Sequence, residues 1–214
     1  MKLLIFDTET TGLPKSREPA IKGAGNWPHL VSIAWKVLDS DFKELSSHYY
    51  IVKPKWTIPA DSVAIHGITQ EKAEAEGIPL STVISKFLET EHDKMVAHNM
   101  NFDYNVLVNA ILWDLTMVVL PDFKPQFCTM DAMRGIMRLP MANGRGYKTP
   151  KLSELYEYTM KKKPEGTLHN SMTDTTLLCE IITKSTILQR MIGLLKDDYI
   201  SANASKKART TLVL

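Results

Sequence analysis

The chain has 214 residues, of which 44% are hydrophobic and 23% are charged, so it can bury a full core as one large soluble domain or one domain with an appendage. Its formal net charge of +2 neither requires nor excludes a polyanionic partner. No window approaches about 18 consecutive apolar residues, and Asp7 interrupts the apolar stretch after Lys2, so we expect neither a membrane span nor a signal peptide. Cys128 and Cys179 are far apart in apolar surroundings, which predicts free thiols and a cytoplasmic protein.

The predicted strands are short apolar or alternating segments, and the predicted helices carry their apolar side chains on one face. In chain order, the expected elements are strand 2–8, strand 30–39, strand 44–54, helix 81–92, strand 94–98, helix 101–115, strand 125–130, helix 131–140, helix 151–164 and helix 170–195. Loops are expected over 14–28 and, with short helical pieces, over 56–77.

This order predicts an α/β fold with a mixed five-stranded sheet, in which three N-terminal strands are followed by βα units and helices cover both faces. The fourth strand is parallel to the first if the helix between them is a crossover. We expect a single domain over 1–195 and a polar, basic tail or frayed helix end over 196–214.

Two acids end the first strand, in the sequence IFDTET. Side chains alternate faces along a strand, so Asp7 and Glu9 lie on one face with their Cα atoms roughly 6.6 Å apart at about 3.3 Å per residue. Two carboxylates at that distance need open water or a cation between them. Taken alone, the pair is typical of a solvated turn.

Two later segments, each at the start of a predicted helix, contain further acids and a histidine. The sequence AHNMNFDYN places Asp103 where the fourth strand gives way to a helix, and HNSMTD places His169 and Asp174 at the start of the last helix. Each acid alone is explained by the favourable interaction of a carboxylate with a helix N-terminus, and His169 by an ordinary loop position. The alternative is that the segments converge at one end of the sheet, where ligands of α/β proteins bind.

Convergence would bring Asp7, Glu9, Asp103 and Asp174 together, and about four negative charges would need two divalent cations. Oxygen ligands without cysteine favour Mg²⁺ or Mn²⁺ over Zn²⁺. Two such ions form a clamp for phosphoryl displacement, and an imidazole at His169 can act as general base near neutral pH. The chemistry implied is phosphodiester hydrolysis.

The three segments FDTETTG, HNMNFD and HNSMTD, in this order, resemble the motifs of the DnaQ-like, or DEDDh, 3′ to 5′ exonucleases. The segment IHGIT at 65–69 matches another common feature of that family, and the resemblance spans about residues 2–184. WPHLVSIAW and GYKTPKLSEL look most like bacterial and phage-type, proofreading-like members. The resemblance implies a ribonuclease H-like fold.

Carried over residue by residue, the resemblance implies roles for the acids and for His169. Asp7, Glu9 and Asp174 would hold the tighter cation, Asp7 would bridge to a second ion, and Asp103 would serve that ion directly or through water. His169 would be the base. The residues expected to contact the terminal nucleotide or its sugar are Thr10, Thr11, Gly12, Leu13, His66 and Phe102. Without the resemblance, His66 is a loop histidine and Phe102 a core residue.

We therefore expect a Mg²⁺- or Mn²⁺-dependent exonuclease that releases 5′-mononucleotides from the 3′ end of single-stranded DNA, in proofreading or DNA degradation. A DNA polymerase or replication protein is a possible partner. An RNA-trimming exonuclease of the same fold is the alternative, since recognition of the 2′-hydroxyl would decide between the two. A non-catalytic nucleic-acid-binding subunit is a third reading, which the presence of all five expected side chains disfavours.

Overall fold

The computed structural model describes residues 1–165 and 168–194, so the expected tail over 196–214 lies outside the described residues. The strands are β1 (Leu3–Thr10), β2 (Leu30–Leu38), β3 (Glu44–Ile51), β4 (Lys94–Ala97) and β5 (Gln126–Cys128). The α-helices are α1 (Ala60–His66), α2 (Gln70–Glu76), α3 (Leu80–Glu89), α4 (Met100–Asn109), α5 (Thr129–Met137), α6 (Leu152–Met160), α7 (Ser171–Lys184) and α8 (Thr186–Ile192). Two short helices complete the set, a 3₁₀ helix η1 (Ala20–Lys22) and a π-helix η2 (Ala110–Asp114).

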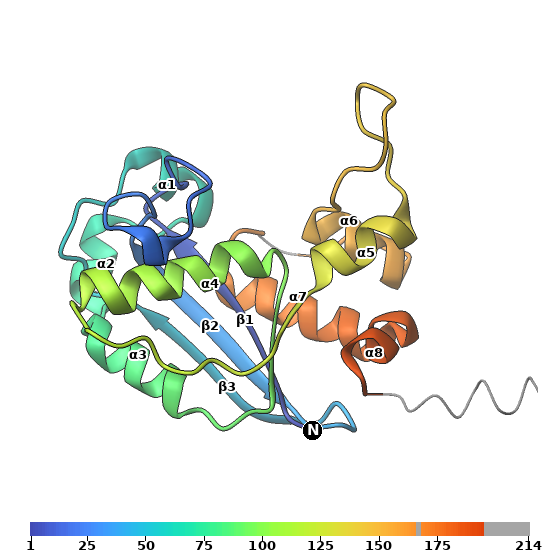
Figure 1. Cartoon of the computed structure of the whole chain (residues 1–214), viewed down its shortest axis with the longest axis horizontal. Coiled ribbons are helices and arrows are strands. Elements are labelled where there is room, and N and C mark those ends of the chain that lie inside the picture. The colour runs from blue at the N-terminus through green and yellow to red at the C-terminus, as the bar shows by residue number, and fades with distance from the viewer. Residues whose placement is uncertain (166–167, 195–214) are drawn as a thin grey trace, which may run out of the picture.

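The five strands form one mixed sheet in the order β3-β2-β1-β4-β5, and Figure 1 labels the first three strands of the chain, β1, β2 and β3. The first three strands pair antiparallel, as expected of a hairpin and a meander. Strand β4 pairs parallel to β1, and β5 parallel to β4, because helices connect these strands. The predicted mixed five-stranded sheet is therefore confirmed, with β1 at its centre.

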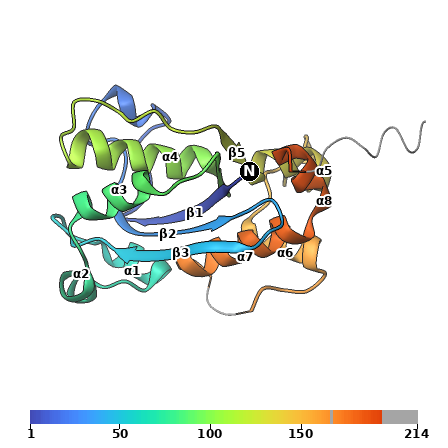
Figure 2. The same ribbon diagram turned by 90° about the horizontal axis from the view of Figure 1, so that it is seen from below.

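Helices cover both faces of the sheet (Figure 2), and the alternation of side chains along β1 divides the core accordingly. Leu4 and Phe6 pack with residues of α3 and α4 on one face. Leu3 and Ile5 pack with residues of α6, α7 and α8 on the other. All four side chains are fully buried, so the strand that ends in the two acids has little freedom to move.

The single helix expected over 170–195 is wrong in the described part of the chain, which has two helices there. Helix α7 ends at Lys184, and Ser185 adopts an extended conformation with φ −89° and ψ 96°. The Ser185 side chain then accepts a hydrogen bond from the backbone N–H of Leu188 and caps α8. Periodicity missed this break because both helices turn apolar side chains toward the same core.

The helix expected over 101–115 is α-helical only in its first part. It begins at Met100 and changes at Ala110 to the wider π-helix η2, in which the N–H of Leu115 donates to the carbonyl of Ala110 at 2.9 Å. Cys128 and Cys179 are both free thiols, of which Cys128 is half-buried and Cys179 is buried. Within residues 1–165 and 168–194, no helix has the length and apolar character needed to cross a membrane.

Candidate active site

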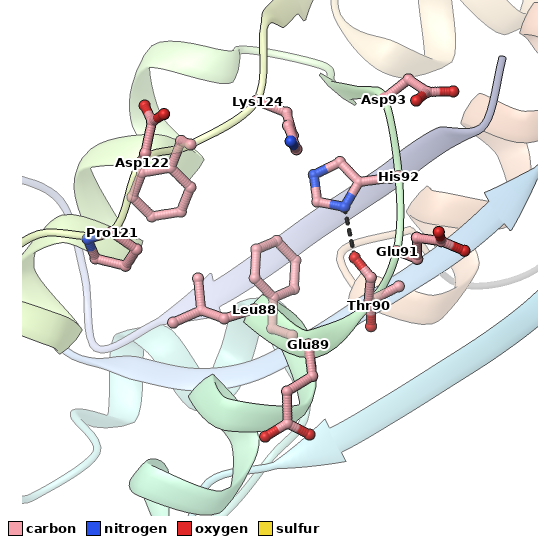
Figure 3. Close-up of a pocket in the computed structure, with 11 residues that line it drawn as sticks. Leu88, Glu89, Thr90, Glu91, His92, Asp93, Pro121, Asp122 and Lys124 are labelled. Atoms are coloured by element: carbon pink, nitrogen blue, oxygen red, sulfur yellow. Dashed lines mark hydrogen bonds between the residues drawn. The ribbon is translucent and has the colours of Figure 1, made fainter.

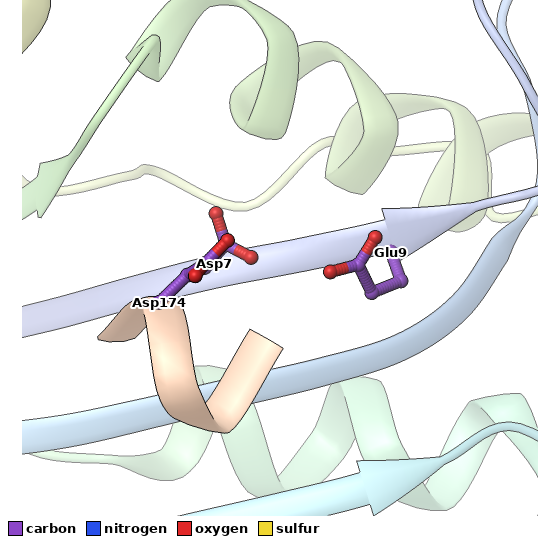
Figure 4. Close-up of side chains that lie close together, drawn as sticks. All are labelled: Asp7, Glu9 and Asp174. Carbon is purple, nitrogen blue, oxygen red and sulfur yellow. The ribbon is translucent and has the colours of Figure 1, made fainter. Parts of the chain in front are cut away.

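Three carboxylates meet on the face of β1 that α7 covers (Figure 4). Asp7 and Glu9 project from the strand, and Asp174 reaches them from the first turn of α7. One oxygen from each lies within 4.8 Å of the others, and Glu9 is buried while Asp7 and Asp174 are half-buried. Two of the three expected segments therefore converge on this face.

Side-chain hydrogen bonds place Asp174 by fixing the start of α7. Asn170 caps the helix, since its Oδ1 accepts from the N–H groups of Met172 and Thr173. The hydroxyls of Ser171 and Ser32 lie 3.1 Å apart, and the Thr175 hydroxyl donates to a carbonyl of β2 at 3.3 Å. The first turn of α7 is thus attached to strand β2, the neighbour of the strand that carries the other two acids.

The fourth acid approaches β1 from its other side. Asp103 lies in the first turn of α4 and is buried with 2% of its surface exposed. Its Oδ1 accepts hydrogen bonds from the backbone N–H of Thr8 at 3.1 Å and from the Thr8 hydroxyl at 2.6 Å. The predicted convergence therefore includes Asp103, but α4 and Thr8 hold it apart from the group of three.

Sequence reasoning gave no role in the site to Thr8 or Tyr49. Side chains alternate faces along a strand, so Thr8 lies on the opposite face from Asp7 and Glu9, toward α4, and this alternation could have indicated its role. Tyr49 lies in the same cross-strand row as Asp7, with Ala34 of β2 between them. Burial raises the pKa of the Tyr49 phenol, and the negative charge of Glu9 adds to this.

Burial raises the pKa of all four acids, and repulsion by neighbouring carboxylates adds to the shift at Asp7, Glu9 and Asp103. Loss of water is the main cause at Asp7, where the charges of Asp103, Glu9 and Asp174 add to it and the pKa lies well above its ordinary value. The same causes raise the pKa of Glu9 to about 8. Burial raises the pKa of Asp103 to about 7, although the Thr8 hydrogen bonds oppose the shift. The cluster favours protons or another cation over free carboxylates.

The geometry fits a divalent cation. The Asp174 Oδ1 atom is buried and has no hydrogen-bond partner among the described residues, although a buried acceptor normally has one. All three clustered side chains offer hard oxygen ligands, the donor type that Mg²⁺ and Mn²⁺ prefer. A cation between them would satisfy this oxygen and remove the repulsion among the acids.

His169 lies beside Asp174 at the edge of the cluster. Its backbone is left-handed, with φ 65°, and its N–H donates to Asp174 Oδ2 at 3.3 Å. The side chain is exposed and lines an open cavity of about 420 Å³ together with Lys151, Leu152 and Asp174. The expected base therefore stands next to a carboxylate of the cluster with its imidazole accessible from solvent.

The residues expected at the terminal nucleotide follow directly on β1. The Thr11 N–H donates to the carbonyl of His29, so a main-chain donor to a substrate from this stretch would come from Gly12 or Leu13. The Thr10 hydroxyl donates to the Gly12 carbonyl at 2.7 Å and tightens the turn. Leu13 exposes 82% of its surface, which is unusual for a leucine held by an ordered turn beside acids.

His66 and Phe102 both lie close to that turn: His66 interacts with the backbone of Thr10, and Phe102 lines a cavity together with Leu13. His66 is buried, its Nδ1 accepts from the N–H of Ile68 at 3.1 Å, and its Nε2 is buried without a partner among the described residues. Burial lowers its pKa, and the nearby backbone of Thr10 opposes that shift. Phe102 is half-buried and packs on Trp27 with ring centres 5.8 Å apart. Both readings of these residues, packing and substrate contact, fit their positions.

Comparison with known proteins identifies the family. The sequence pattern of the family described as Exonuclease matches residues 4–182, which include all three motifs. The chain belongs to the DnaQ-like 3′ to 5′ exonucleases. Members of this family are hydrolases that use divalent metal ions, and the acidic cluster of Asp7, Glu9 and Asp174 lies within the matched residues.

This DnaQ-like chain spans only a small part of one similar protein and less than half of another, but nearly the whole length of a third. A PolC-type DNA polymerase III of Thermotoga petrophila is 24% identical over 194 residues, which are 90% of this chain but 12% of that protein. Exonuclease I of E. coli, in complex with a dT13 oligonucleotide, has a TM-score of 0.67 at 17% identity, over 89% of this chain and 42% of its own. Exonuclease X, in complex with 5′-overhanging duplex DNA, has a TM-score of 0.56 at 25% identity, over 86% of this chain and 92% of its own. The ribonuclease H-like fold is therefore confirmed.

Proposed function

We propose that this chain is a metal-dependent exonuclease that removes 5′-mononucleotides from the 3′ end of single-stranded DNA. The observation that carries the proposal is the group of three carboxylates, Asp7, Glu9 and Asp174, with a buried oxygen that lacks a partner. Such a group is costly unless a cation completes it. Membership of the exonuclease family and a matching fold support the same activity.

Asp7, Glu9 and Asp174 would hold one divalent ion, with Asp7 shared with a second ion that Asp103 also serves. Mg²⁺ or Mn²⁺ fits this oxygen donor set. When bound, a pair of such ions neutralises the charge that develops on the phosphate and favours ionisation of the attacking water. The protein supplies the rigid placement of the four acids, because β1, α4 and α7 are all anchored in the core.

His169 would accept the proton of the attacking water. Its exposed imidazole stands beside Asp174, whose carboxylate accepts a hydrogen bond from the backbone N–H of His169. The backbone of His169 is left-handed and leads directly into the Asn170 cap, which places the residue immediately before α7. A positioned general base of this kind contributes typically 10²–10⁴-fold to rate.

Single-stranded DNA is the favoured substrate because the similar structures were determined with DNA. Exonuclease I of E. coli was solved with a dT13 oligonucleotide, and exonuclease X with an overhanging duplex. Similarity to a PolC-type polymerase supports a link to replication, with a DNA polymerase as partner. The domain over 1–195, the tail over 196–214 and a cytoplasmic location remain parts of this proposal.

The proposal is tested with matched single-stranded DNA and RNA oligonucleotides, labelled at either end and incubated with Mg²⁺ or Mn²⁺. We expect a 3′ label to be released first as a mononucleotide, and a 5′ label to remain on a ladder of shortening products. Asp7→Ala should abolish cleavage while leaving the circular dichroism spectrum unchanged. Release of the 5′ label first, or full activity of Asp7→Ala, would refute the proposal, and faster cleavage of RNA would assign the enzyme to RNA.

A further inference from the structure

The turn over 10–13, which follows the acids of β1, is held by the residue that precedes β2. The N–H of Thr11 donates to the carbonyl of His29 at 3.0 Å, and the N–H of His29 donates to the Thr11 hydroxyl at 3.0 Å. The register of β1 against β2 shifts between Glu9 and Thr10, an irregularity that is common beside active sites. The two hydrogen bonds of His29 therefore hold the chain where the regular ladder ends.

The side chain of His29 is fixed on two sides. Its Nδ1 lies 2.9 Å and 3.0 Å from the two carboxylate oxygens of Asp114, and since a carboxylate only accepts hydrogen bonds, Nδ1 carries the hydrogen. The imidazole also stacks on Trp56, with ring centres 4.1 Å apart and 15° between the planes. His29 thus has a fixed ring as well as a backbone bonded to the turn.

Asp114 is itself buried, with 6% of its side chain exposed. No lysine or arginine pairs with it within residues 1–165 and 168–194. Its second partner is Asn109, whose Nδ2 donates to Asp114 Oδ2 at 3.3 Å. A carboxylate buried in this way adds little to stability, because the loss of water offsets the gain from its partners. Its clearest effect is to orient the ring of His29.

The π-helix η2 brings Asp114 to this position. In an α-helix with 3.6 residues per turn, side chains five residues apart point about 140° away from each other. Asn109 and Asp114 are five residues apart and still bond to each other, because the wider turn of a π-helix returns such a pair to one side. Short π-helices are rare and frequently lie at functional sites. Here the last residue of η2 meets the residue that holds the turn.

The turn offers two main-chain donors to a ligand. The N–H groups of Gly12 and Leu13 donate to no acceptor in the described part of the chain, while the Thr10 hydroxyl closes the turn on the Gly12 carbonyl at 2.7 Å. Under the proposed function, the sugar of the terminal nucleotide lies against this turn, and its 3′-hydroxyl is an acceptor of suitable size. A hydrogen bond weakens steeply when its angle departs from linear, so the direction of these donors depends on how Thr11 is held.

We infer that Asp114 and His29 are positioning residues, which fix the turn over 10–13 so that it recognises a free 3′-hydroxyl. The inference rests on the proposed function and adds to it a means of distinguishing one strand end from another. Asp114 orients the ring of His29, and the backbone of His29 holds Thr11. Both residues act through the turn and leave the acids and their cations to the chemical step.

The first test compares two oligonucleotides that differ only in a 3′-hydroxyl or a 3′-deoxy end. We expect the wild-type protein to favour the hydroxyl end roughly 10-fold in kcat/KM, the contribution of about one hydrogen bond. Asp114→Ala should reduce this preference to about 2-fold, with the loss confined to the hydroxyl end. Asp114→Asn, which keeps an acceptor for Nδ1–H, should retain most of the preference. Equal losses at both ends in Asp114→Ala, or no preference in the wild-type protein, would overturn the inference.

The second comparison is between His29→Ala and His48→Ala. His48 is a matched control because it is also a half-buried histidine stacked on a tryptophan, with ring centres 4.9 Å from Trp35, and has no hydrogen bond to the turn. His29→Ala should lower the preference for the hydroxyl end as Asp114→Ala does, and His48→Ala should leave it unchanged. The same preference in both histidine variants would contradict the assignment of His29.

Hydrogen exchange at the Thr11 amide tests the positioning without any activity. Because this N–H donates to the carbonyl of His29, Asp114→Ala should speed its exchange by about 10-fold, whereas His48→Ala should not. Unchanged exchange in Asp114→Ala would overturn the inference. A wild-type protein that cleaves neither oligonucleotide would refute the proposed function, and the exchange measurement would still decide whether Asp114 fixes the turn.

Discussion

Carboxylates gather at both ends of β1, and the two groups differ in burial and in partners. At the start of the strand, Glu91 and Asp93 lie beside a cavity of about 380 Å³ whose other acids are Glu89 and Asp122 (Figure 3). All four acids are exposed. Lys2 forms an ion pair with Glu91, and its backbone N–H donates to Asp93 at 2.7 Å. The hydrogen bond from Lys2, together with its charge, lowers the pKa of Glu91.

At the other end of β1, two of the acids are buried instead of exposed. Glu9 and Asp103 expose 9% and 2% of their surface, and no lysine or arginine pairs with either within the described residues. Their pKa values rise to about 8 and about 7. Acids in water with a cationic neighbour need nothing more, whereas buried acids without one require a cation from outside the chain. Burial and missing partners distinguish the candidate site better than the number of acids does.

The largest predicted difference between the two groups appears when one acid is removed from each. We expect Asp7→Ala to lower kcat for single-stranded DNA by a factor on the order of 10³ or more, because the proposed metal site loses one of its three clustered carboxylates. Asp122→Ala, in the exposed group, should leave kcat unchanged. Steady-state cleavage of a labelled oligonucleotide measures both, and similar losses in the two variants would contradict the distinction.

Each group of acids also has a histidine nearby, and the second prediction compares these two histidines. His169→Ala should lower kcat by about 10²-fold or more with little change in KM, because a positioned base acts in the chemical step. His92, whose Nδ1 bonds to the carbonyl of Thr90 in the other cavity, provides the control His92→Asn. Equal kcat values for wild type and His169→Ala would remove His169 from the mechanism.

The raised pKa values predict how metal-free protein responds to pH. Glu9 and Asp103 hold protons in the folded state up to about pH 8 and 7, whereas in the unfolded chain they lose them near their ordinary values of 4.5 and 3.8. Stability from these groups is therefore present below about pH 4 and is lost as pH rises toward 8. We expect a loss on the order of a few kcal/mol, or roughly 5–10 °C in Tm, between pH 5 and pH 8 in EDTA.

Calorimetry of the EDTA-treated protein measures this effect. Addition of Mg²⁺ at pH 8 should restore much of the lost stability, since a cation that binds only the folded state raises Tm. Glu9→Gln should flatten the dependence on pH in EDTA, whereas Glu91→Gln, at the exposed end, should not. A Tm that rises between pH 5 and pH 8 without metal would contradict the buried, unpartnered state of the cluster.

The smallest predicted effect concerns the residue that holds Asp103. Thr8→Val keeps the shape of the side chain but removes the 2.6 Å hydrogen bond to Asp103 Oδ1, while the backbone N–H of residue 8 still donates. We expect a loss of about 10-fold in kcat, the low end of the effects seen when a residue that orients a metal ligand by a hydrogen bond is replaced. Thr176→Val removes a hydroxyl that bonds only within α7 and serves as the control. Equal activity of both variants would mean that the N–H alone orients Asp103.

The sequence predicts the central features of the fold because they follow from simple patterns. The run that ends in IFDTET is apolar on both faces, so a buried central strand is the natural reading, and β1 is that strand. The acids and the histidine of the three motifs lie at strand ends and helix starts, where side chains from distant segments meet. The mixed order of strands follows from which connections contain helices.

Other features depend on contacts that periodicity does not record. The break at Ser185 rests on one capping hydrogen bond, and the sequence around it remains amphipathic. That Asp103 approaches from the α4 side was hidden, because a spacing of residues says which segments meet but not from which face. The pairing of Thr8 with Asp103 joins residues 95 positions apart and becomes visible only in three dimensions.

The attachment of α7 to β2 has a consequence for how this chain can vary. Asp174 takes its position from Ser171, Thr175 and the Asn170 cap, all of which lie at or after the start of the helix. Among the described residues between α6 and His169, none takes part in these hydrogen bonds. We therefore expect that a change in the length of this connection leaves Asp174 in place beside Asp7 and Glu9.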